Sequence, residues 1–181
     1  QGLPTPKMER WKYTNIARAV KDNISKAQPA EIKKNTSEYA VLYTGEADLP
    51  DWVRDILAET PPQQEKYDDW ALWALNNAFL HNILVVDIPA NTQLEKPLEL
   101  NLTALENSLG TARLVIRIGE SSDVIIHESS TTPKDSHSGL WMNILTQAVV
   151  GKNARLCHYR LNNLQDNDVF TQTTHVKIDR D

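Results

Sequence analysis

From residue 83 onward, short apolar runs alternate with turns in a pattern that repeats along the chain. Each copy ends an apolar strand, passes through proline or glycine and a small polar residue, and enters a second apolar strand. The three copies are Val86–Leu94, Ile116–Val124 and Ala148–Leu156. Their anchors Pro89, Gly119 and Gly151 are 30 and 32 positions apart. Self-similarity at such a period indicates a repeat architecture.

The runs that flank these turns alternate with a period of two residues. Leu114, Ile116 and Ile118 share one face, whereas Val115 and Arg117 share the other. This period excludes helical repeats, and no helical pattern separates the strands. We therefore expect a mainly β chain in which strand–turn–strand rungs stack into a parallel β-helix (a solenoid). The alternative is a sandwich in which the three passages are unrelated hairpin strands.

The geometry of stacked rungs gives each turn residue a role. We expect Gly119 and Gly151 to take positive φ where the chain turns sharply. Asn91, Ser121 and Asn153 can hydrogen-bond their own backbone at a corner. Superposition of the three copies predicts two columns in the core, with Ile88, Ile118 and Val150 in one and Leu94, Val124 and Leu156 in the other.

Residues 1–80 are predicted to form a helical region before the repeat, and residues 81–181 its first rungs. A short helix is expected from Thr5 and Pro6, anchored by the apolar side chains of Trp11, Tyr13 and Ile16. Further expectations are a loop or frayed helix over Lys21–Glu38, a strand over Tyr39–Thr44 with a turn at Gly45, and a helix over Pro50–Leu57 with Trp52, Ile56 and Leu57 on its buried face.

The clearest predicted helix runs from Asp68 to Leu80, with Asp68 or Asp69 as its cap. Its expected apolar surface comprises Trp70, Trp73, Ala74, Leu75, Ala78 and Phe79. A stack of rungs needs its first rung covered, and this helix is the expected lid. A cofactor site built on the paired tryptophans is the less favoured alternative, because aromatic residues at helical spacing usually belong to a core.

Composition limits the classes of function. The 181 residues are 40% hydrophobic and 24% charged, with a net charge of −5, so no basic field attracts nucleic acid or an anionic membrane. No apolar run approaches the roughly 18 residues of a membrane span, and the start lacks a signal-peptide pattern. Cys157 is the only cysteine. The expected location is therefore the reducing cytoplasm.

Neither catalytic nor metal-binding spacing is present in the sequence. The five histidines are not paired at ligand spacing, and Cys157 and His158 should point to opposite faces of a strand. Acidic residues that a carbohydrate-active β-helix enzyme would gather are scattered, at Asp123, Glu128, Asp166 and Asp168. Phosphate-binding and nucleophile motifs are missing too. We expect no catalytic, cofactor-binding or metal-binding residues.

The opening of the chain carries a family resemblance. Leu3–Thr14, which reads Leu-Pro-Thr-Pro-Lys-Met-Glu-Arg-Trp-Lys-Tyr-Thr, resembles the first motif of the SufD branch of the SufB/SufD family, whose members are scaffold subunits of the Suf iron–sulfur cluster assembly system. Leu75–Phe79 and the Ile88-Pro-Ala passage are similar to the family's entry into its β-helix, and Val149–Leu161 is similar to one rung. Residues 21–60 match poorly.

This resemblance implies a right-handed parallel β-helix and a non-catalytic scaffold that works with SufB and the ATPase SufC. The chain corresponds to the N-terminal half of such a subunit, so the implied partner surfaces lie mostly beyond residue 181. No cofactor is expected on this chain alone, since the assembled complex handles the cluster. We also expect self-association through the last rung. The competing functions are a carbohydrate-active β-helix enzyme and a generic β-solenoid interaction module.

Overall fold

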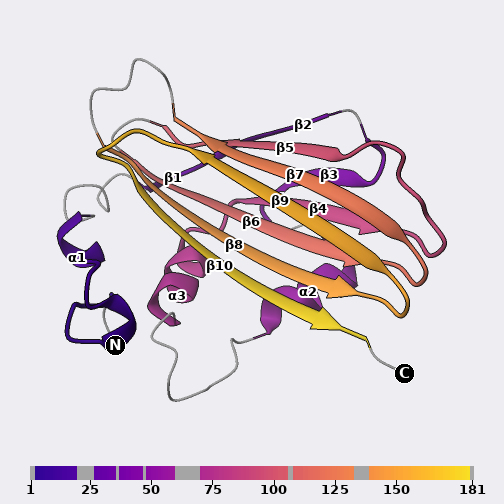
Figure 1. Ribbon diagram of the computed structural model, residues 1–181, viewed down its shortest axis with the longest axis horizontal. Coiled ribbons are helices and arrows are strands. Elements are labelled where there is room, and N and C mark those ends of the chain that lie inside the picture. Colours follow the sequence, from indigo (N-terminus) through magenta and orange to yellow (C-terminus); the bar gives the residue numbers. More distant parts are fainter. Residues whose placement is uncertain are drawn as a thin grey trace.

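The chain is mainly β, with two sheets and a few short helices (Figure 1). The computed structural model describes residues 3–19, 27–35, 37–46, 48–59, 70–105, 108–132 and 139–179. The predicted cap at Asp68 or Asp69 lies outside these residues.

Two sheets contain all of the described strands. Sheet A has the order β10-β8-β6-β4-β3, with β1 also paired to β6, and sheet B has the order β2-β5-β7-β9. The strands of sheet A are β1 (Ala27–Pro29), β3 (Ala40–Thr44), β4 (Asn82–Ile88), β6 (Leu109–Ile118), β8 (Trp141–Val150) and β10 (Val169–Ile178). The strands of sheet B are β2 (Glu31–Lys34), β5 (Leu98–Thr103), β7 (Asp123–Thr131) and β9 (Arg155–Asn163).

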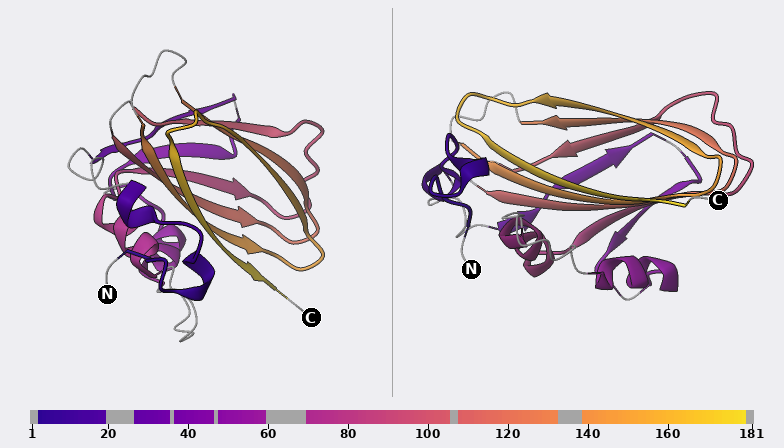
Figure 2. Two further views of the ribbon diagram at one scale, coloured as in Figure 1. Left: turned by 60° about the vertical axis from the view of Figure 1, so that its left-hand side comes forward. Right: turned by 60° about the horizontal axis from the view of Figure 1, so that its bottom comes forward.

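From β4 onward the chain passes from one sheet to the other with every strand. From β6 onward each strand pairs in parallel with the strand two places earlier, so β4, β6, β8 and β10 run in one direction within sheet A. The same holds for β5, β7 and β9 in sheet B. Figure 2 shows the two sheets as two layers. The sheets are mixed, because β3 pairs with β4 and β2 pairs with β5 in antiparallel fashion.

The main core lies between the layers. The first predicted column is confirmed, since Ile88 pairs with Ile118 and Ile118 with Val150, and Ile178 extends it. In the second column Val124 pairs with Leu156. Leu94 packs against the same core, directly after the bridge between Gln93 and Asp123. The alternation on β6 is also confirmed, with Leu114, Ile116 and Ile118 facing this core and Val115 facing a second cluster outside it.

The turns that connect sheet A to sheet B stack on each other, but the predicted role of their glycines is wrong. Among the described non-glycine residues, φ is positive at Asn91, Ser121 and Asn153, whereas Gly45 is the described glycine with positive φ. Gly119 is required for a different reason. A Cβ added there would lie 2.6 Å from the Pro89 carbonyl carbon, so a side chain has no room between adjacent turns.

Two helices cover the outer face of sheet A (Figure 2). Helix α2 (Asp51–Ala58) forms where the sequence predicts it, but its buried residues are Val53 and Ile56, in one cluster with Val85 and Val115, whereas Trp52 and Leu57 are only partly buried. Helix α3 (Trp70–Ala78) contacts β6, β8 and β10. It therefore does not cover the first rung as a lid. The first strands are instead flanked by the antiparallel strands β3 and β2.

The buried face of α3 differs from the predicted one. Leu72, Trp73 and Asn76 are buried, whereas Trp70 and Phe79 are exposed. The reason is that the outer face of sheet A is itself partly polar. Asn76 is buried because it hydrogen-bonds that face, and the broad apolar surface expected from the sequence turns partly toward solvent.

Residues 3–35 also depart from the predictions. The expected helix at Thr5 is a turn followed by the short 3₁₀ helix η1 (Glu9–Trp11), and α1 (Ile16–Ala19) comes next. Ile16 is buried as expected, but Tyr13 is 92% exposed and anchors nothing. The stretch expected to be loop or frayed helix contains β1 and β2. These strands form because the edges of β6 and β5 supply their hydrogen bonds, which local composition does not reveal.

Candidate functional site

The inner face of sheet B changes from apolar to polar along the winding. On β5 its inner residues are leucines, and on β7 the inner residues Val124 and Ile126 are followed by Glu128 and Ser130. The next strand continues this polar surface, because Ile126 pairs with His158 and Glu128 pairs with Arg160. We call Glu128, His158, Arg160 and Gln172 the interior cluster.

Glu128 is the centre of the interior cluster, and its side chain is 1% exposed. His158 Nε2 lies 2.8 Å from Glu128 Oε2, and the Arg160 Nε lies 3.5 Å from the same oxygen. From the opposite sheet, the Gln172 amide donates to Glu128 Oε1 at 2.9 Å. A buried carboxylate is tolerated when a cation and several donors compensate it, and here both oxygens are occupied.

The hydrogen bonds fix the proton on His158. Arg160 Nη2 lies 3.3 Å from His158 Nδ1, and a guanidinium can only donate, so Nδ1 is the acceptor. The imidazole proton is then on Nε2, where it is donated to Glu128. A general base needs a free acceptor facing its substrate. Neither nitrogen of His158 offers one, so the cluster holds strands together more readily than it moves protons.

Two buried hydroxyl groups also face the interior. Ser130 Oγ on β7 and Thr146 Oγ1 on β8 have no hydrogen-bond partner among the described residues. Thr146 pairs in register with Leu114 on one side and Thr174 on the other. Polar side chains therefore enter the mainly apolar interior from both sheets, on β7 and β8.

The outer face of sheet B carries a second carboxylate–imidazole pair. Glu99, His127 and Tyr159 are neighbours in register on β5, β7 and β9. His127 Nδ1 lies 3.0 Å from Glu99 Oε1, and its ring meets Tyr159 edge to face. Cys157 belongs to this outer face and pairs with Ile125, whereas His158 faces inward. As predicted, Cys157 and His158 do not converge on one site.

A polar network also lies under α3. Arg113, which is 0% exposed, donates from Nε to Asn76 Oδ1 at 3.0 Å and from Nη1 to Gln147 Oε1 at 2.7 Å, and also binds Asn77. Asn76 in turn donates to the carbonyl and side-chain oxygens of Asn143. Burial lowers the pKa of Arg113 to about 10. This network attaches α3 to sheet A.

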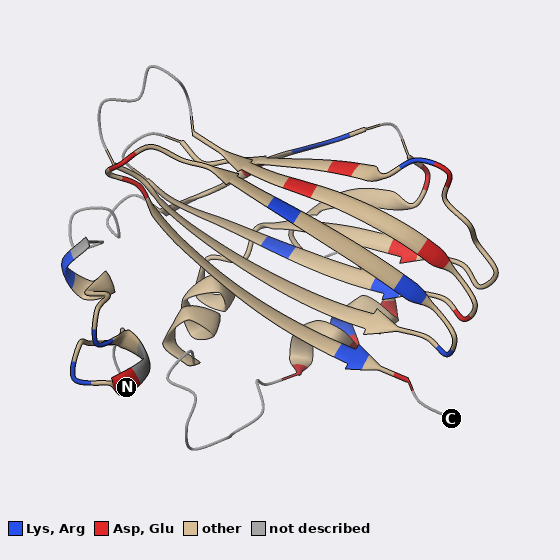
Figure 3. Cartoon of the chain, viewed as in Figure 1, with Lys and Arg blue, Asp and Glu red and all other residues tan. Residues whose placement is uncertain are grey.

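Nearby, Arg117 makes a bidentate ion pair with Asp87, with Nε 2.8 Å from Oδ1 and Nη2 2.6 Å from Oδ2. Its guanidinium carbon lies 4.0 Å from the centre of the Trp52 ring. Because Trp52 is on α2 and Asp87 is on β4, Arg117 fixes α2 to the outer face of sheet A. Acidic and basic positions are otherwise interspersed along the strands (Figure 3), consistent with the small net charge.

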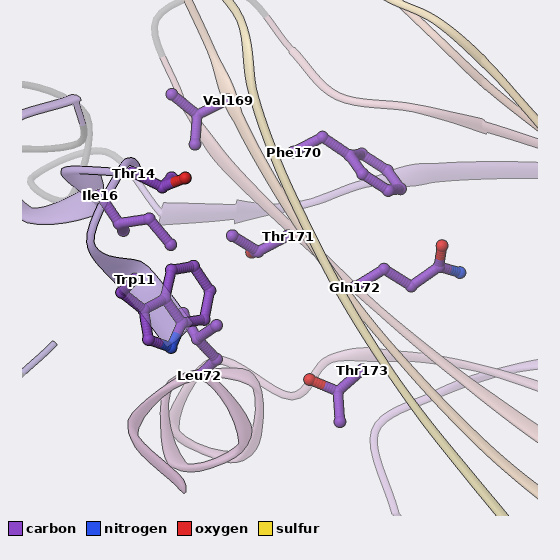
Figure 4. Close-up of a pocket in the computed structure, with 9 residues that line it drawn as sticks. All are labelled: Trp11, Thr14, Ile16, Leu72, Val169, Phe170, Thr171, Gln172 and Thr173. Atoms are coloured by element: carbon purple, nitrogen blue, oxygen red, sulfur yellow. The ribbon is translucent and has the colours of Figure 1, made fainter. Parts of the chain in front are cut away.

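A pocket of about 270 Å³ lies where residues 11–16 meet the edge of β10. Figure 4 shows Trp11, Ile16 and Leu72 on one side of β10, and Phe170 and Gln172 on the other. The Trp11 indole N–H has no partner among the described residues. Gln172 lines this pocket and also belongs to the interior cluster, so the two features adjoin.

The residues considered from the sequence are not brought into one catalytic site. Asp123 pairs with Arg155, and this hydrogen bond raises the pKa of Arg155. Asp168 accepts backbone hydrogen bonds from Leu140 and Gln165 in a turn. Within the described residues, no group of three His, Cys, Asp or Glu could hold a metal ion.

Sequence reasoning treated Glu128 as one of several scattered acids and so missed the interior cluster. A signal was available, because Val124, Ile126, Glu128 and Ser130 occupy alternate positions of one strand. That parity places the carboxylate inside the core. The remaining acid, Asp166, is exposed.

Among the described helices, none is long and apolar enough to cross a membrane. Neither the curated proteins nor the solved structures contain a significant match to the chain. One family model does match, over residues 101–181, and is described as the SufBD core domain of SUF system FeS cluster assembly. The matched segment runs from β5 to the end of β10 and contains the whole interior cluster. The match supports membership of the SufB/SufD family and points to iron–sulfur cluster assembly, without distinguishing SufD from SufB.

Proposed function

We propose that this chain is a non-catalytic scaffold in iron–sulfur cluster assembly, belonging to the SufD branch and working with a SufB-like subunit and a SufC-like ATPase. The observation that carries this proposal is the match of the SufBD core domain to residues 101–181. The SufD-like sequence of Leu3–Thr14 favours that branch. The cluster would be the cargo of the complex, and this chain alone would hold none.

The winding of β4 to β10 supports a right-handed parallel β-helix as the fold of this part. From β6 to β10 every strand pairs in parallel with the strand two places earlier, and equivalent turns stack on one another. Residues 1–80 would form a region at the side and first edge of this solenoid. We also propose a cytoplasmic location, because a chain with a single cysteine suits a reducing compartment.

The chemistry of the described residues supports a scaffold better than an enzyme. Both oxygens of Glu128 and both nitrogens of His158 are occupied by other side chains. The outer Glu99–His127 pair has only one ring nitrogen engaged by a carboxylate, but no third acidic or thiol ligand accompanies it among the described residues. Neither pair is arranged to activate a substrate.

Within the described residues, backbone groups of β9 and β10 are available to a further strand. Within the described residues each pairs on one side only, with β7 and β8 respectively. Val169 N donates to Leu140 O and Asp179 N donates to Val150 O. In a parallel ladder the backbone N–H and C=O groups of successive residues point alternately to the two sides of the strand. The backbone groups of odd-numbered β10 residues therefore point toward β8, and those of even-numbered residues point toward the free edge. Ladder groups of this kind can accept a further strand, whether from the same chain, a partner subunit or a second copy.

The test is to co-express the chain with SufB-like and SufC-like subunits, purify the complex, and then reconstitute it anaerobically with iron and sulfide. We expect a three-subunit complex that acquires a cluster chromophore, while this chain alone acquires none and hydrolyses no ATP. Absence of a complex contradicts the partner proposal. A stable chromophore on the chain alone, abolished in Cys157→Ser, contradicts the scaffold proposal.

A matched pair of variants tests the edge. Val176→Pro removes a backbone N–H that faces away from β8, so it should block strand addition while leaving the β8–β10 ladder in place. Val176→Thr keeps the N–H and is the control. We expect Val176→Pro alone to lower partner binding and self-association in sedimentation. Equal binding by both variants would show that β10 is not the contact.

A further inference from the structure

Helices α2 and α3 lie on the same outer face of sheet A, but each packs on its own apolar cluster (Figure 2). The buried members of the α2 cluster are Leu49, Val53, Ile56, Ile83, Val85 and Val115. The buried members of the α3 cluster are Ile16, Leu72, Leu109 and Trp141. The two clusters share no buried residue, so apolar packing attaches each helix to the sheet separately.

Polar side chains connect what the apolar clusters leave separate. Arg113 lies on β6 between Leu109 of one cluster and Val115 of the other. It donates to Asn76 and Asn77 in the last turn of α3, and from Nη1 to Gln147 Oε1 on β8 at 2.7 Å. Gln147 Nε2 in turn donates at 2.7 Å to the carbonyl oxygen of Ile56, in the last turn of α2. A continuous chain of hydrogen bonds therefore runs from α3 to α2.

Burial makes this chain of bonds sensitive to the position of both helices. Arg113 is 0% exposed and Gln147 is 2% exposed, so water does not replace a partner that moves away. Displacement of α3 removes two acceptors from a buried charge. Displacement of α2 removes the Ile56 carbonyl that holds Gln147 Nε2. Because the carboxamide is rigid and planar, that bond also directs Oε1 toward Arg113.

We propose that Arg113 and Gln147 couple the positions of α2 and α3, so that displacement of one helix loosens the other. Arg113 is then a positioning residue for both helices. Arg117, four residues further along β6, differs in this respect, because it has a carboxylate partner in Asp87 and contacts α2 through Trp52. The outer face of sheet A thereby contains a conformational device that transmits an event at α2 to α3.

The test is a double-mutant cycle read by hydrogen exchange and mass spectrometry. Val53→Ala removes buried methyl groups from α2 without touching the polar network. We expect residues 70–78 of α3 to exchange about 3- to 10-fold faster in Val53→Ala than in the wild type. In an Arg113→Met background, which keeps the apolar stem, Val53→Ala should no longer change the α3 rate. Arg117→Met is the matched control, and in its background Val53→Ala should still accelerate α3.

Three results would overturn the proposal: an α3 rate that Val53→Ala leaves unchanged, acceleration of α3 that persists in Arg113→Met, or loss of that acceleration in Arg117→Met as well. If Arg113→Met does not fold, Gln147→Met decides, because it cuts the link to Ile56 and leaves Arg113 bonded to α3. In that background Val53→Ala should accelerate α2 alone. Acceleration of α3 there would show that something other than Gln147 connects the helices.

Discussion

The stacked turns should make Gly119→Ala one of the most destabilising single-methyl changes in the chain. The added Cβ would lie 2.6 Å from the Pro89 carbonyl carbon and 2.8 Å from Ala90 Cα, and nearer still to Ala90 N. All three are backbone atoms of the adjacent turn, so no flexible side chain can move aside. The two turns must separate by about an ångström to restore ordinary contact.

That separation weakens the hydrogen bonds between the turns. Gly119 N donates to Ile88 O at 2.8 Å, and Asn91 N donates to Glu120 O at 2.8 Å. Overpacking costs about 1–3 kcal/mol, and each weakened bond adds about 1 kcal/mol. We therefore expect Gly119→Ala to lower the free energy of unfolding by about 3–5 kcal/mol, measured by urea denaturation.

Gly45→Ala is the matched control. Gly45 has φ of +77°, but nothing lies within 4 Å of an added Cβ. It therefore isolates the conformational penalty of a left-handed backbone, about 1–2 kcal/mol. Gly151→Ala should fall between the two, since its Cβ would lie 2.9 Å from Glu120 N. If Gly45→Ala destabilises as much as Gly119→Ala, close approach of the turns is not what requires glycine there.

Two further predictions concern the core and the polar network. Ile118→Ala removes the centre of a stacked column and should lower the free energy of unfolding by about 2–5 kcal/mol. Ser121→Ala in the adjoining turn should lower it by less than about 1 kcal/mol. Equal effects of the two changes in denaturation would refute the column. Arg113 has a pKa lowered to about 10 when folded, so the unfolded chain binds its proton more tightly and stability should rise with pH between about 10 and 12.5. The rise should total about 3 kcal/mol relative to Arg113→Gln, and parallel stability curves for the two proteins would contradict it.

Period-two patterning predicted the repeating part of the chain well. Once Pro89, Gly119 and Gly151 are superposed, alternation fixes which residues face the core, and the structure pairs Ile88, Ile118 and Val150 accordingly. The reason for the glycines could not be derived in the same way. Close approach between adjacent turns is a tertiary property, whereas a single turn considered alone suggests a positive φ.

Strands β1 and β2 illustrate a second limit. Their sequences are polar and lysine-rich, and they become strands because β6 and β5 offer unpaired edges. The same limit applies to α3. Its apolar residues predicted a broad buried face. Asn76 occupies part of the buried face instead, because it hydrogen-bonds Arg113 and Asn143 on sheet A.

The sequence could predict only one member of the interior cluster. Strand parity alone places Glu128 inside the core. Its donors come from positions 30, 32 and 44 residues away, and their convergence depends on the register of two sheets. Acidic residues in register on the outer faces of successive strands would indicate a catalytic groove. Glu128 and its partners face inward, so that criterion does not find them.

The register of the sheets has a consequence for how related sequences should vary in length. Val124 and Leu156 are 32 positions apart, whereas Leu98 and Ile126 are 28 apart. The turns at 119–122 and 151–154 have the same length, so the extra residues of the longer coil lie between Thr131 and Trp141, at the opposite end of the strands. Insertions and deletions should therefore be tolerated at that end, where they lengthen one connection and leave the turns at 119–122 and 151–154 unchanged. The same site is the place to insert a tag or a reporter, because a change there alters the length of one coil without shifting any strand against its neighbours.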